Sequence, residues 1–173
     1  MKKIAVIGFV ILTLCFTAFA QKKTTAKADP AKEVRAAFDR LVEGIKEANA
    51  EKVMSVYENS DRTLFFNYNG TATIGWQNMM DNRKSSYADR SNVNLETTGV
   101  RVEVLSPTSA YVSCKWKQSQ EYKGDLENST GRMTLIFKKI GQDWKIVHLH
   151  TSPDAAPDKI VIPPSEKAGD KEN

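Results

Sequence analysis

Apolar residues recur along this chain first at helical spacing and later at strand spacing. From Val34 to Ile45 they return every three or four positions, which predicts an amphipathic helix that begins near Asp29-Pro30. Aspartate is a good helix cap and proline suits the first helical turn, so this start is well marked. A second, shorter helix is predicted from about Ala50 to Tyr57, after a break at Asn49.

The pattern then changes to that of strands. Residues 63–68 and 71–74 flank Asn69-Gly70, a typical hairpin turn, and a third helix is predicted over about 77–87. Alternating positions predict four longer strands at 93–105, 110–121, 131–140 and 144–151, with a polar loop at 123–128. Helices packed on one face of a curved antiparallel sheet suit this order of elements, so the predicted fold class is α+β.

The two ends differ in composition from this central part. Residues 1–20 combine Lys2-Lys3, an apolar run and Ala18-Phe19-Ala20, the pattern of a secretory signal peptide. Cys15 would suit a lipoprotein, but Leu14 stands where a small residue normally precedes a lipidated cysteine. We therefore expect an exported protein, periplasmic or secreted, with a flexible leader at 21–29, one domain at 30–157 and a disordered tail at 158–173.

Charge and cysteine content narrow the range of functions. The chain has 25 basic against 21 acidic residues, and the predicted signal peptide would remove two of the lysines. A net charge of about +2, with basic and acidic residues interleaved, does not form the basic patch that binds nucleic acid. No nucleic-acid partner is therefore expected. After cleavage no stretch is long and apolar enough to span a membrane. Cys114 would be the only remaining cysteine, which excludes an internal disulfide, and its apolar neighbours predict an inert core thiol.

The last two strands carry the most specific pattern. Gly131-Arg132-Met133-Thr134, with the stretch from Gly141 to Ser152, resembles the closing strands of SnoaL-like domains of the nuclear transport factor 2-like superfamily. The stretch from His148 to Pro157 is also similar to the end of the calcium/calmodulin-dependent protein kinase II association domain. The resemblance implies a cone-shaped fold, in which a curved antiparallel sheet wraps the N-terminal helices and leaves a pocket open at one end. It also implies a homodimer or a higher homo-oligomer, because such domains pair through the sheet and the kinase-association branch builds rings.

His148 and His150 are the first candidates for that pocket. Period-two alternation would place both on the same strand face as Trp144, so an inward-facing Trp144 would bring them into the cavity. They could act as an acid–base or ligand-binding pair, because histidine titrates near neutral pH, or they could tie the strand to the first helix. A metal site would need further ligands, which no motif marks, so neither a metal nor another cofactor is expected.

Arg132 and three aromatic residues complete the candidate pocket. By the same resemblance, Arg132 is expected to point inward, where it would bind an anionic ligand or pair with a carboxylate on a helix. Tyr57, Tyr68 and Trp76 could line the walls of a small-molecule site or simply pack in the core. No nucleophile motif, phosphate-binding loop or paired-carboxylate signature is present. The active residues of the ketosteroid isomerase and scytalone dehydratase branches cannot be matched to positions in this chain.

Three functions follow from these alternatives. The one we predict is an exported, dimeric module that binds a small organic molecule, which Arg132 would favour as an anion. The second is a cofactor-free acid–base enzyme of the isomerase, dehydratase or hydrolase type, with a histidine as the base. The third is an oligomeric scaffold whose pocket is unused. An enzyme requires a titratable group with a shifted pKa inside the cavity, whereas a binding module requires only a shaped cavity and a charge partner.

Overall fold

The computed structural model describes residues 29–154, and the predicted signal peptide and the tail at 158–173 lie outside the described residues. The elements follow the predicted order: α1 (Pro30–Lys46), α2 (Ala50–Ser55), β1 (Leu64–Phe66), β2 (Ala72–Ile74), α3 (Trp76–Ala88), β3 (Arg90–Ser106), β4 (Ser109–Tyr122), β5 (Asp125–Ile140) and β6 (Asp143–Pro153). Within this part of the chain, no helix is both long enough and apolar enough to cross a membrane.

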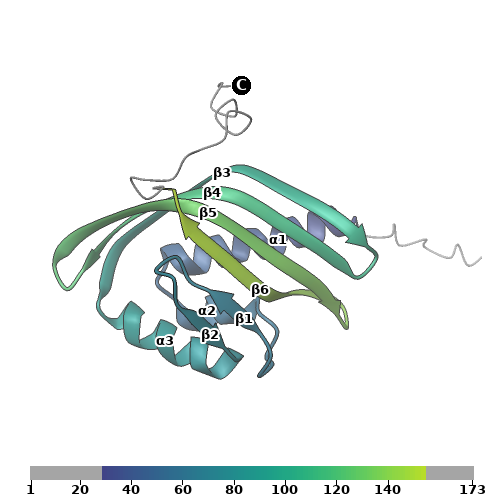
Figure 1. Cartoon of the computed structure of the whole chain (residues 1–173), viewed down its shortest axis with the longest axis horizontal. Coiled ribbons are helices and arrows are strands. Elements are labelled where there is room, and N and C mark those ends of the chain that lie inside the picture. The colour runs from purple at the N-terminus through teal and green to yellow at the C-terminus, as the bar shows by residue number, and fades with distance from the viewer. Residues whose placement is uncertain (1–28, 155–173) are drawn as a thin grey trace, which may run out of the picture.

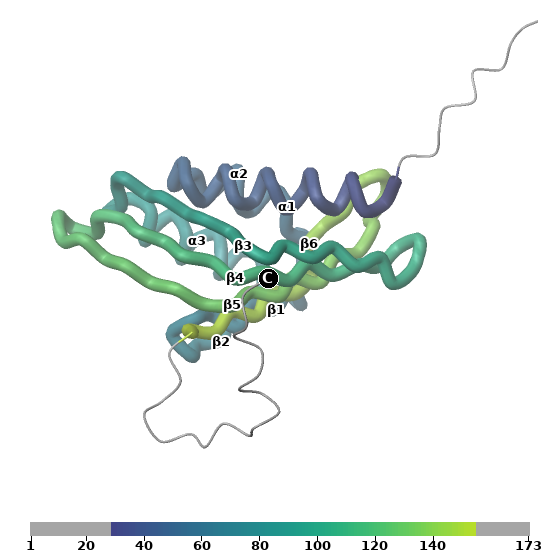
Figure 2. Tube along the Cα trace, turned by 90° about the horizontal axis from the view of Figure 1, so that it is seen from above, coloured from purple at the N-terminus to yellow at the C-terminus, as the bar shows by residue number. Residues whose placement is uncertain are grey.

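The six strands form one curved sheet in the order β2-β1-β6-β5-β4-β3. Neighbouring strands are antiparallel except β1 and β6, which pair in parallel, so the sheet is mixed. Figures 1 and 2 show α1 lying along one face of the long strands, and Figure 1 shows α3 and the β1–β2 hairpin below the arch that these strands form. The predicted α+β cone is confirmed.

The core forms where the apolar face of α1 meets the concave side of the sheet. Val34, Phe38 and Leu41 are spaced along one face of the helix, and each exposes at most 1% of its surface. They belong to one hydrophobic cluster with Leu135 and Phe137 of β5, which are fully buried. Burial of this helical stripe orients α1 across the sheet and leaves one end of the concave face uncovered by it.

The two N-terminal helices begin where the sequence predicts. The side chain of Asp29 accepts a hydrogen bond from the amide of Ala31 at 3.0 Å, with Pro30 at the first helical position. Asn49 caps α2 in the same way, since its side chain accepts from the amide of Lys52 at 2.8 Å. The break predicted at Asn49 is therefore the start of the second helix.

The turn between β4 and β5 differs from the prediction. The polar stretch 123–128 predicts a loop, but only Lys123 and Gly124 separate Tyr122 from Asp125, and the two strands pair directly beyond them. Both turn residues have positive φ, 53° and 90°, as in a two-residue type I′ turn that follows the twist of the strands. The predicted loop is wrong because the strands pair through backbone atoms. This pairing does not depend on side-chain polarity, so it extends the hairpin through the polar stretch.

One residue of β6 has no partner on β5. Adjacent residues of β5 pair with His148 and Ile146, so Val147 between them is skipped. Such a β-bulge reverses the alternation of side chains beyond it. Ile146 and Leu149 are accordingly both buried although they are three positions apart.

β3 is the long edge strand at the other side of the sheet, and its pairing with β4 is irregular. The register shifts between Ser91 and Asn94, between Thr98 and Arg101, and between Val104 and Ser106. Gly99 lies within the second of these irregularities with a φ of 60°, a left-handed conformation that glycine adopts without strain. These shifts bend the strand, which helps the sheet to curve.

Gly131 allows a close approach between β5 and its two neighbouring strands. A Cβ atom at this position would lie 2.8 Å from the ring of Trp116 on β4 and would also meet the backbone oxygen of Ser152 on β6. The first obstacle is a large aromatic ring and the second is backbone, so neither can yield without moving the sheet. The ring of Trp116 can lie against β5 only because residue 131 has no side chain.

Gly131→Ala should therefore destabilise the protein by about 2 kcal/mol, a typical cost of overpacking a close-packed site. Urea unfolding followed by circular dichroism measures this loss. The matched control is Thr130→Ala, at the exposed neighbouring position, which should change the unfolding free energy by less than about 0.5 kcal/mol. A Gly131→Ala protein as stable as this control would contradict the close contact.

The N-terminal half of α1 is tied to the last two strands through Glu33. Its Oε2 atom accepts hydrogen bonds from Lys139 Nζ and Trp144 Nε1, both at 2.8 Å. The hydrogen bond from Lys139 and that from Trp144 lower the pKa of the Glu33 carboxyl group below its ordinary value. This network joins the first helix to the final hairpin.

Glu33 should make the stability of the fold depend on pH in the acid range. Its pKa is lower in the folded chain, so its contribution is complete above the ordinary value of 4.5 and is lost as the pH falls through the folded value. Glu33→Gln should lower the melting temperature at neutral pH, and the difference from wild type should shrink on acidification. Melting curves of both proteins measured across this pH range test the expectation. A difference that stays constant with pH would contradict it.

Candidate functional site

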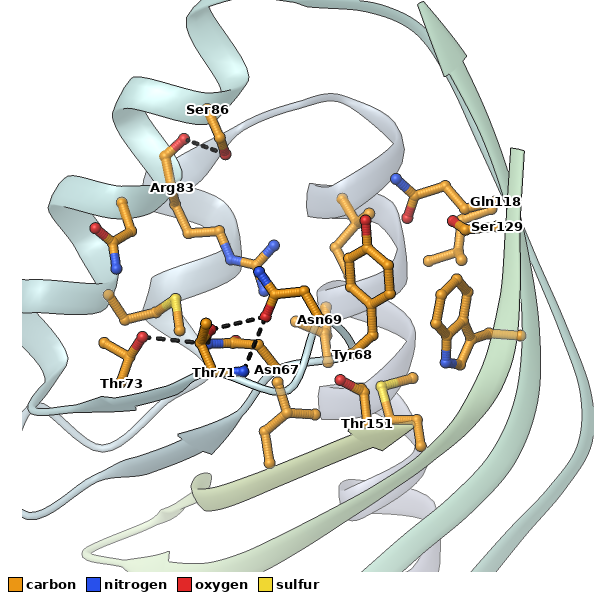
Figure 3. Close-up of a pocket in the computed structure, with 18 of the residues that line it drawn as sticks. Asn67, Tyr68, Asn69, Thr71, Thr73, Arg83, Ser86, Gln118, Ser129 and Thr151 are labelled. Carbon is orange, nitrogen blue, oxygen red and sulfur yellow. Dashed lines mark hydrogen bonds between the residues drawn. The ribbon is translucent and has the colours of Figure 1, made fainter. Parts of the chain in front are cut away.

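A pocket of about 350 Å³ opens between α3, the β1–β2 hairpin and the concave face of the sheet (Figure 3). Its lining residues are Leu41, Ile45, Tyr57, Asn67, Tyr68, Asn69, Thr71, Thr73, Met79, Asn82, Arg83, Ser86, Arg90, Leu95, Trp116, Gln118, Gln120, Ser129, Met133, Leu149 and Thr151. The lining mixes apolar side chains of the core with amides, hydroxyls and two arginines.

One face of α3 forms a wall of the pocket. Its lining residues are Met79, Asn82, Arg83 and Ser86. Their spacing of three and four positions places them on the same side of the helix. Figure 3 shows the side chain of Arg83 reaching from α3 toward Asn69 in the hairpin turn. The helix therefore presents a polar stripe, with one guanidinium, to the pocket.

The turn between β1 and β2 forms a second wall, and its side chains bond one another. Asn67 Nδ2 donates to the hydroxyl of Thr71 at 3.1 Å and to that of Thr73 at 3.2 Å. Asn69 Oδ1 accepts from the amide of Thr71 at 3.1 Å and from its hydroxyl at 2.7 Å (Figure 3). These bonds hold the turn in shape through contacts within the turn itself.

Aromatic rings stand at the mouth and in the depth of the pocket. Tyr68 is 51% exposed and meets Trp116 edge-on, with 6.0 Å between ring centroids. Tyr57 is buried and packs against Phe65 at 4.9 Å. Burial raises the pKa of the Tyr57 hydroxyl well above its ordinary value, so this group stays protonated at neutral pH.

Arg83 and Arg90 supply the positive charge of the lining. Each guanidinium lies over the ring of Tyr87, with its Cζ atom 5.7 Å and 5.4 Å from the ring centroid, respectively. Arg83 Nη1 also donates to the Tyr87 hydroxyl at 3.4 Å. Burial lowers the pKa of Arg83, but the nearby hydroxyls of Tyr87 and Tyr57 raise it, and the net direction is upward. The group therefore remains a fixed positive charge.

A chain of amides forms the polar edge on β4 and β5. Gln118 Nε2 donates to Gln120 Oε1 at 2.6 Å, and Gln120 Nε2 donates to Glu127 Oε2 at 2.7 Å. Glu127 lies outside the lining, so the two glutamines separate its carboxylate from the pocket. The edge is polar without being acidic.

His148 and His150 lie on the outer side of the sheet and do not line this pocket. Beyond the bulge at Val147, it is Leu149 and Thr151 that line it, so the histidines beside them point outward. The expectation that both histidines share a face with the buried Trp144 is therefore wrong, because one skipped residue breaks the period-two alternation.

On the outer side, the two histidines surround Phe66 of β1. Their rings meet Phe66 edge-on, with centroid distances of 5.5 Å for His148 and 5.7 Å for His150. His148 Nδ1 lies 3.1 Å from the carbonyl oxygen of Leu64. His148 thus ties β6 to β1, rather than to the first helix, through its side chain as well as through the backbone.

Arg132 and Trp76 also lie outside the pocket, whereas Tyr57 and Tyr68 line it. Arg132 has a 66% exposed side chain on the outer side of β5, and its Nε atom lies 3.7 Å from Asp154. It is on the outer side because its neighbour Gly131 faces inward. Trp76 donates from Nε1 to the carbonyl oxygen of Met54 at 2.9 Å and so ties α3 to the end of α2.

Neither Arg83 nor Arg90 is among the site residues predicted from the sequence. For Arg83 a signal was present, because Asn82, Arg83 and Ser86 share one helical face with Met79 in a helix that must pack on the sheet. Arg90 gave no comparable signal, since its direction depends on where α3 ends and β3 begins. The predicted cationic group exists in the pocket, but it comes from α3 and β3 instead of β5.

Comparison with known proteins connects this geometry to a family. The model of the SnoaL-like domain family matches residues 34–156, most of the chain. The chain belongs to the SnoaL-like domain family. No curated protein is significantly similar in sequence to this SnoaL-like domain. Many solved structures share its fold.

Two of these structures illustrate the extent of the similarity. A nuclear transport factor 2-like superfamily protein from Salmonella enterica is 22% identical, covers 73% of this chain and 92% of its own, and has a TM-score of 0.67. A Xanthomonas campestris protein named for the calcium/calmodulin-dependent protein kinase II association domain is 19% identical, with coverages of 77% and 95% and a TM-score of 0.62. At these identities the similarity establishes the cone-shaped fold of the SnoaL-like domain and nothing of its ligand.

Arg132→Gln should change the unfolding free energy by less than about 0.5 kcal/mol, because an exposed ion pair contributes little. It should also leave binding of any molecule in the pocket unaltered, since its side chain lies on the other side of the sheet. Urea unfolding measures the first effect. A fluorescence titration with N-phenyl-1-naphthylamine, an uncharged dye that fluoresces in apolar sites, measures the second. A loss of dye affinity in Arg132→Gln would contradict the outward orientation of this residue.

Proposed function

We propose that this SnoaL-like domain binds a small organic molecule in the pocket between α3, the β1–β2 turn and the sheet. The proposal rests on the composition of the lining, which combines apolar and aromatic surface with a few hydrogen-bonding groups. This combination is typical of small-molecule sites, and a volume of about 350 Å³ lies at the lower end of their usual range. The molecule that fits is correspondingly small.

The same lining favours binding over acid–base catalysis. Acid–base chemistry near neutral pH calls for a group that gains and loses a proton there. Within the described residues, the pocket is lined by no histidine, aspartate or glutamate. Tyr57 is held protonated by burial and Arg83 keeps its charge, so neither exchanges a proton readily at neutral pH. The acid–base alternative relied on His148 and His150, which lie on the outer side of the sheet.

Preorganisation gives further support to a binding role. The hydrogen bonds among Asn67, Asn69 and Thr71 fix the turn, and Trp76 fixes the start of α3. Two walls of the pocket are therefore set by contacts that need no ligand. The dimer and the export expected from the sequence remain predictions that belong to the same proposal.

Filling the pocket with a bulky side chain should abolish binding. Ser129 lines the pocket, whereas the next residue, Thr130, is exposed and points outward. N-phenyl-1-naphthylamine, an uncharged dye that fluoresces in apolar sites, is a suitable probe. We expect wild type and Thr130→Trp to increase its fluorescence to the same extent, and Ser129→Trp to lose most of the increase.

The outcome separates the pocket from other apolar surfaces of the protein. Equal fluorescence in Ser129→Trp and Thr130→Trp, with both variants folded by circular dichroism, would contradict the proposal. Native mass spectrometry of the protein purified gently from its own host extends the test to the natural ligand. A reproducible added mass in wild type that is absent from Ser129→Trp would support the proposal, and the same spectra report the oligomeric state.

A further inference from the structure

Unpaired hydrogen-bond donors are concentrated in the pocket. Among the described residues, three buried side-chain polar atoms lack a partner: Arg83 Nε, Arg90 Nε and Trp116 Nε1. All three belong to residues that line the pocket, and all three are donors. Buried polar groups are nearly always paired in folded proteins, so three unpaired donors in one pocket call for an explanation. A bound molecule that carries acceptor atoms would pair them.

The charge of the lining is equally one-sided. Arg83 and Arg90 are its only charged residues within the described part of the chain, and neither forms an ion pair there. Glu127, behind the two glutamines of β4, is engaged by Gln120 at 2.7 Å. Both side chains are half-buried, and a partly buried guanidinium that lacks a carboxylate keeps an unbalanced charge at a cost in stability. A bound anion would supply the missing charge.

Tyr87 holds the two arginine side chains in place, but it does not pair their buried N–H donors. Both guanidinium groups lie over its ring, at 5.7 Å and 5.4 Å. This contact with the ring holds each group in place without using its N–H donors. The single hydrogen bond, from Arg83 Nη1 to the Tyr87 hydroxyl, is long at 3.4 Å. The contact with Tyr87 therefore leaves most of these donors free to bind a molecule in the pocket.

We propose that the ligand is an organic anion, a carboxylate or a sulfonate, attached to an apolar or aromatic body. Its acidic group accepts hydrogen bonds from Arg83 and gains further attraction from Arg90, in the manner usual for guanidinium and oxyanions. Its body lies on the apolar lining beside Leu95 and Met133. An acceptor on that body would take up the N–H group of Trp116. This inference rests on the proposed binding function and adds the chemical class of the ligand.

Two dyes that differ in one acidic group test the inference. 8-Anilinonaphthalene-1-sulfonate carries the same aromatic body as the uncharged N-phenyl-1-naphthylamine, with one added sulfonate. Fluorescence titration of wild type should give tighter binding of the sulfonate. Arg83→Gln should weaken the affinity for the sulfonate by about 10- to 100-fold, the range expected for the loss of hydrogen bonds to a charged group. The affinity for the uncharged dye should stay within about twofold of wild type.

A matched control removes the same charge from the same helix. Lys84, next to Arg83, is exposed and pairs with Glu51 at 3.1 Å, so Lys84→Gln alters net charge without touching the pocket. It should bind both dyes as wild type does. A comparable loss of sulfonate affinity in Lys84→Gln would show that the loss in Arg83→Gln comes from the change in net charge and not from a contact in the pocket. That result would overturn the inference. Arg90→Gln is the second variant, with a smaller selective loss of the sulfonate expected.

The remaining outcomes separate this inference from the proposed function. Equal affinity of wild type for the two dyes, or a loss of both in a folded Arg83→Gln, would overturn anion recognition and leave the binding function standing. Failure of both dyes to bind wild type would overturn the binding function itself. If Arg83→Gln does not fold by circular dichroism, the Arg90→Gln titration decides, and unchanged sulfonate affinity in that variant would overturn the inference.

Discussion

The pairing between β5 and β6 slips by one residue at Val147, and the contents of the pocket depend on that slip. Before it, Ile146 is buried, and its backbone pairs with Val56 and Glu58 in the segment that follows α2. After it, Leu149 and Thr151 face inward, whereas His148 and His150 face outward, where β6 pairs with β1. Without the extra residue, two imidazoles would occupy the concave face, and the chemistry available there would change from hydrogen-bond donation to proton exchange.

The order and type of the elements could be read from the sequence because they depend on local patterns. Asp29 and Asn49 cap helices, Asn69-Gly70 turns a hairpin, and the apolar stripe of α1 marks the core. The directions of His148, His150 and Arg132 could not be read with the same success. A bulge leaves no reliable signal in the residues around Val147, since it is set by how two distant strands align. The polar residues 123–128 do not predict the hairpin at Lys123-Gly124 for a related reason, because its strands pair through backbone atoms.

The pocket residues differ from the rest of the fold in how well their polar groups are paired. The sheet, α1 and the Glu33 network form a well-paired frame in which polar groups have partners. Among the described residues, the three buried donors that lack a partner all lie at one end of that frame, in the pocket. A sequence optimised for stability alone would have given Arg83 a carboxylate neighbour. Departures from local pairing rules of this kind are expected where a protein meets a ligand.

The irregular edge of β3 has a consequence for self-association. A long, flat edge strand offers a row of unpaired N–H and C=O groups on which another chain can add a strand and begin a fibril. β3 has 17 residues, but its register shifts and the left-handed Gly99 divide that row into short pieces. Exposed charged side chains such as those of Arg101 and Glu103 also make this edge polar. An incoming strand would lose register after a few residues, so the features that curve the sheet also keep the folded domain from templating its own aggregation.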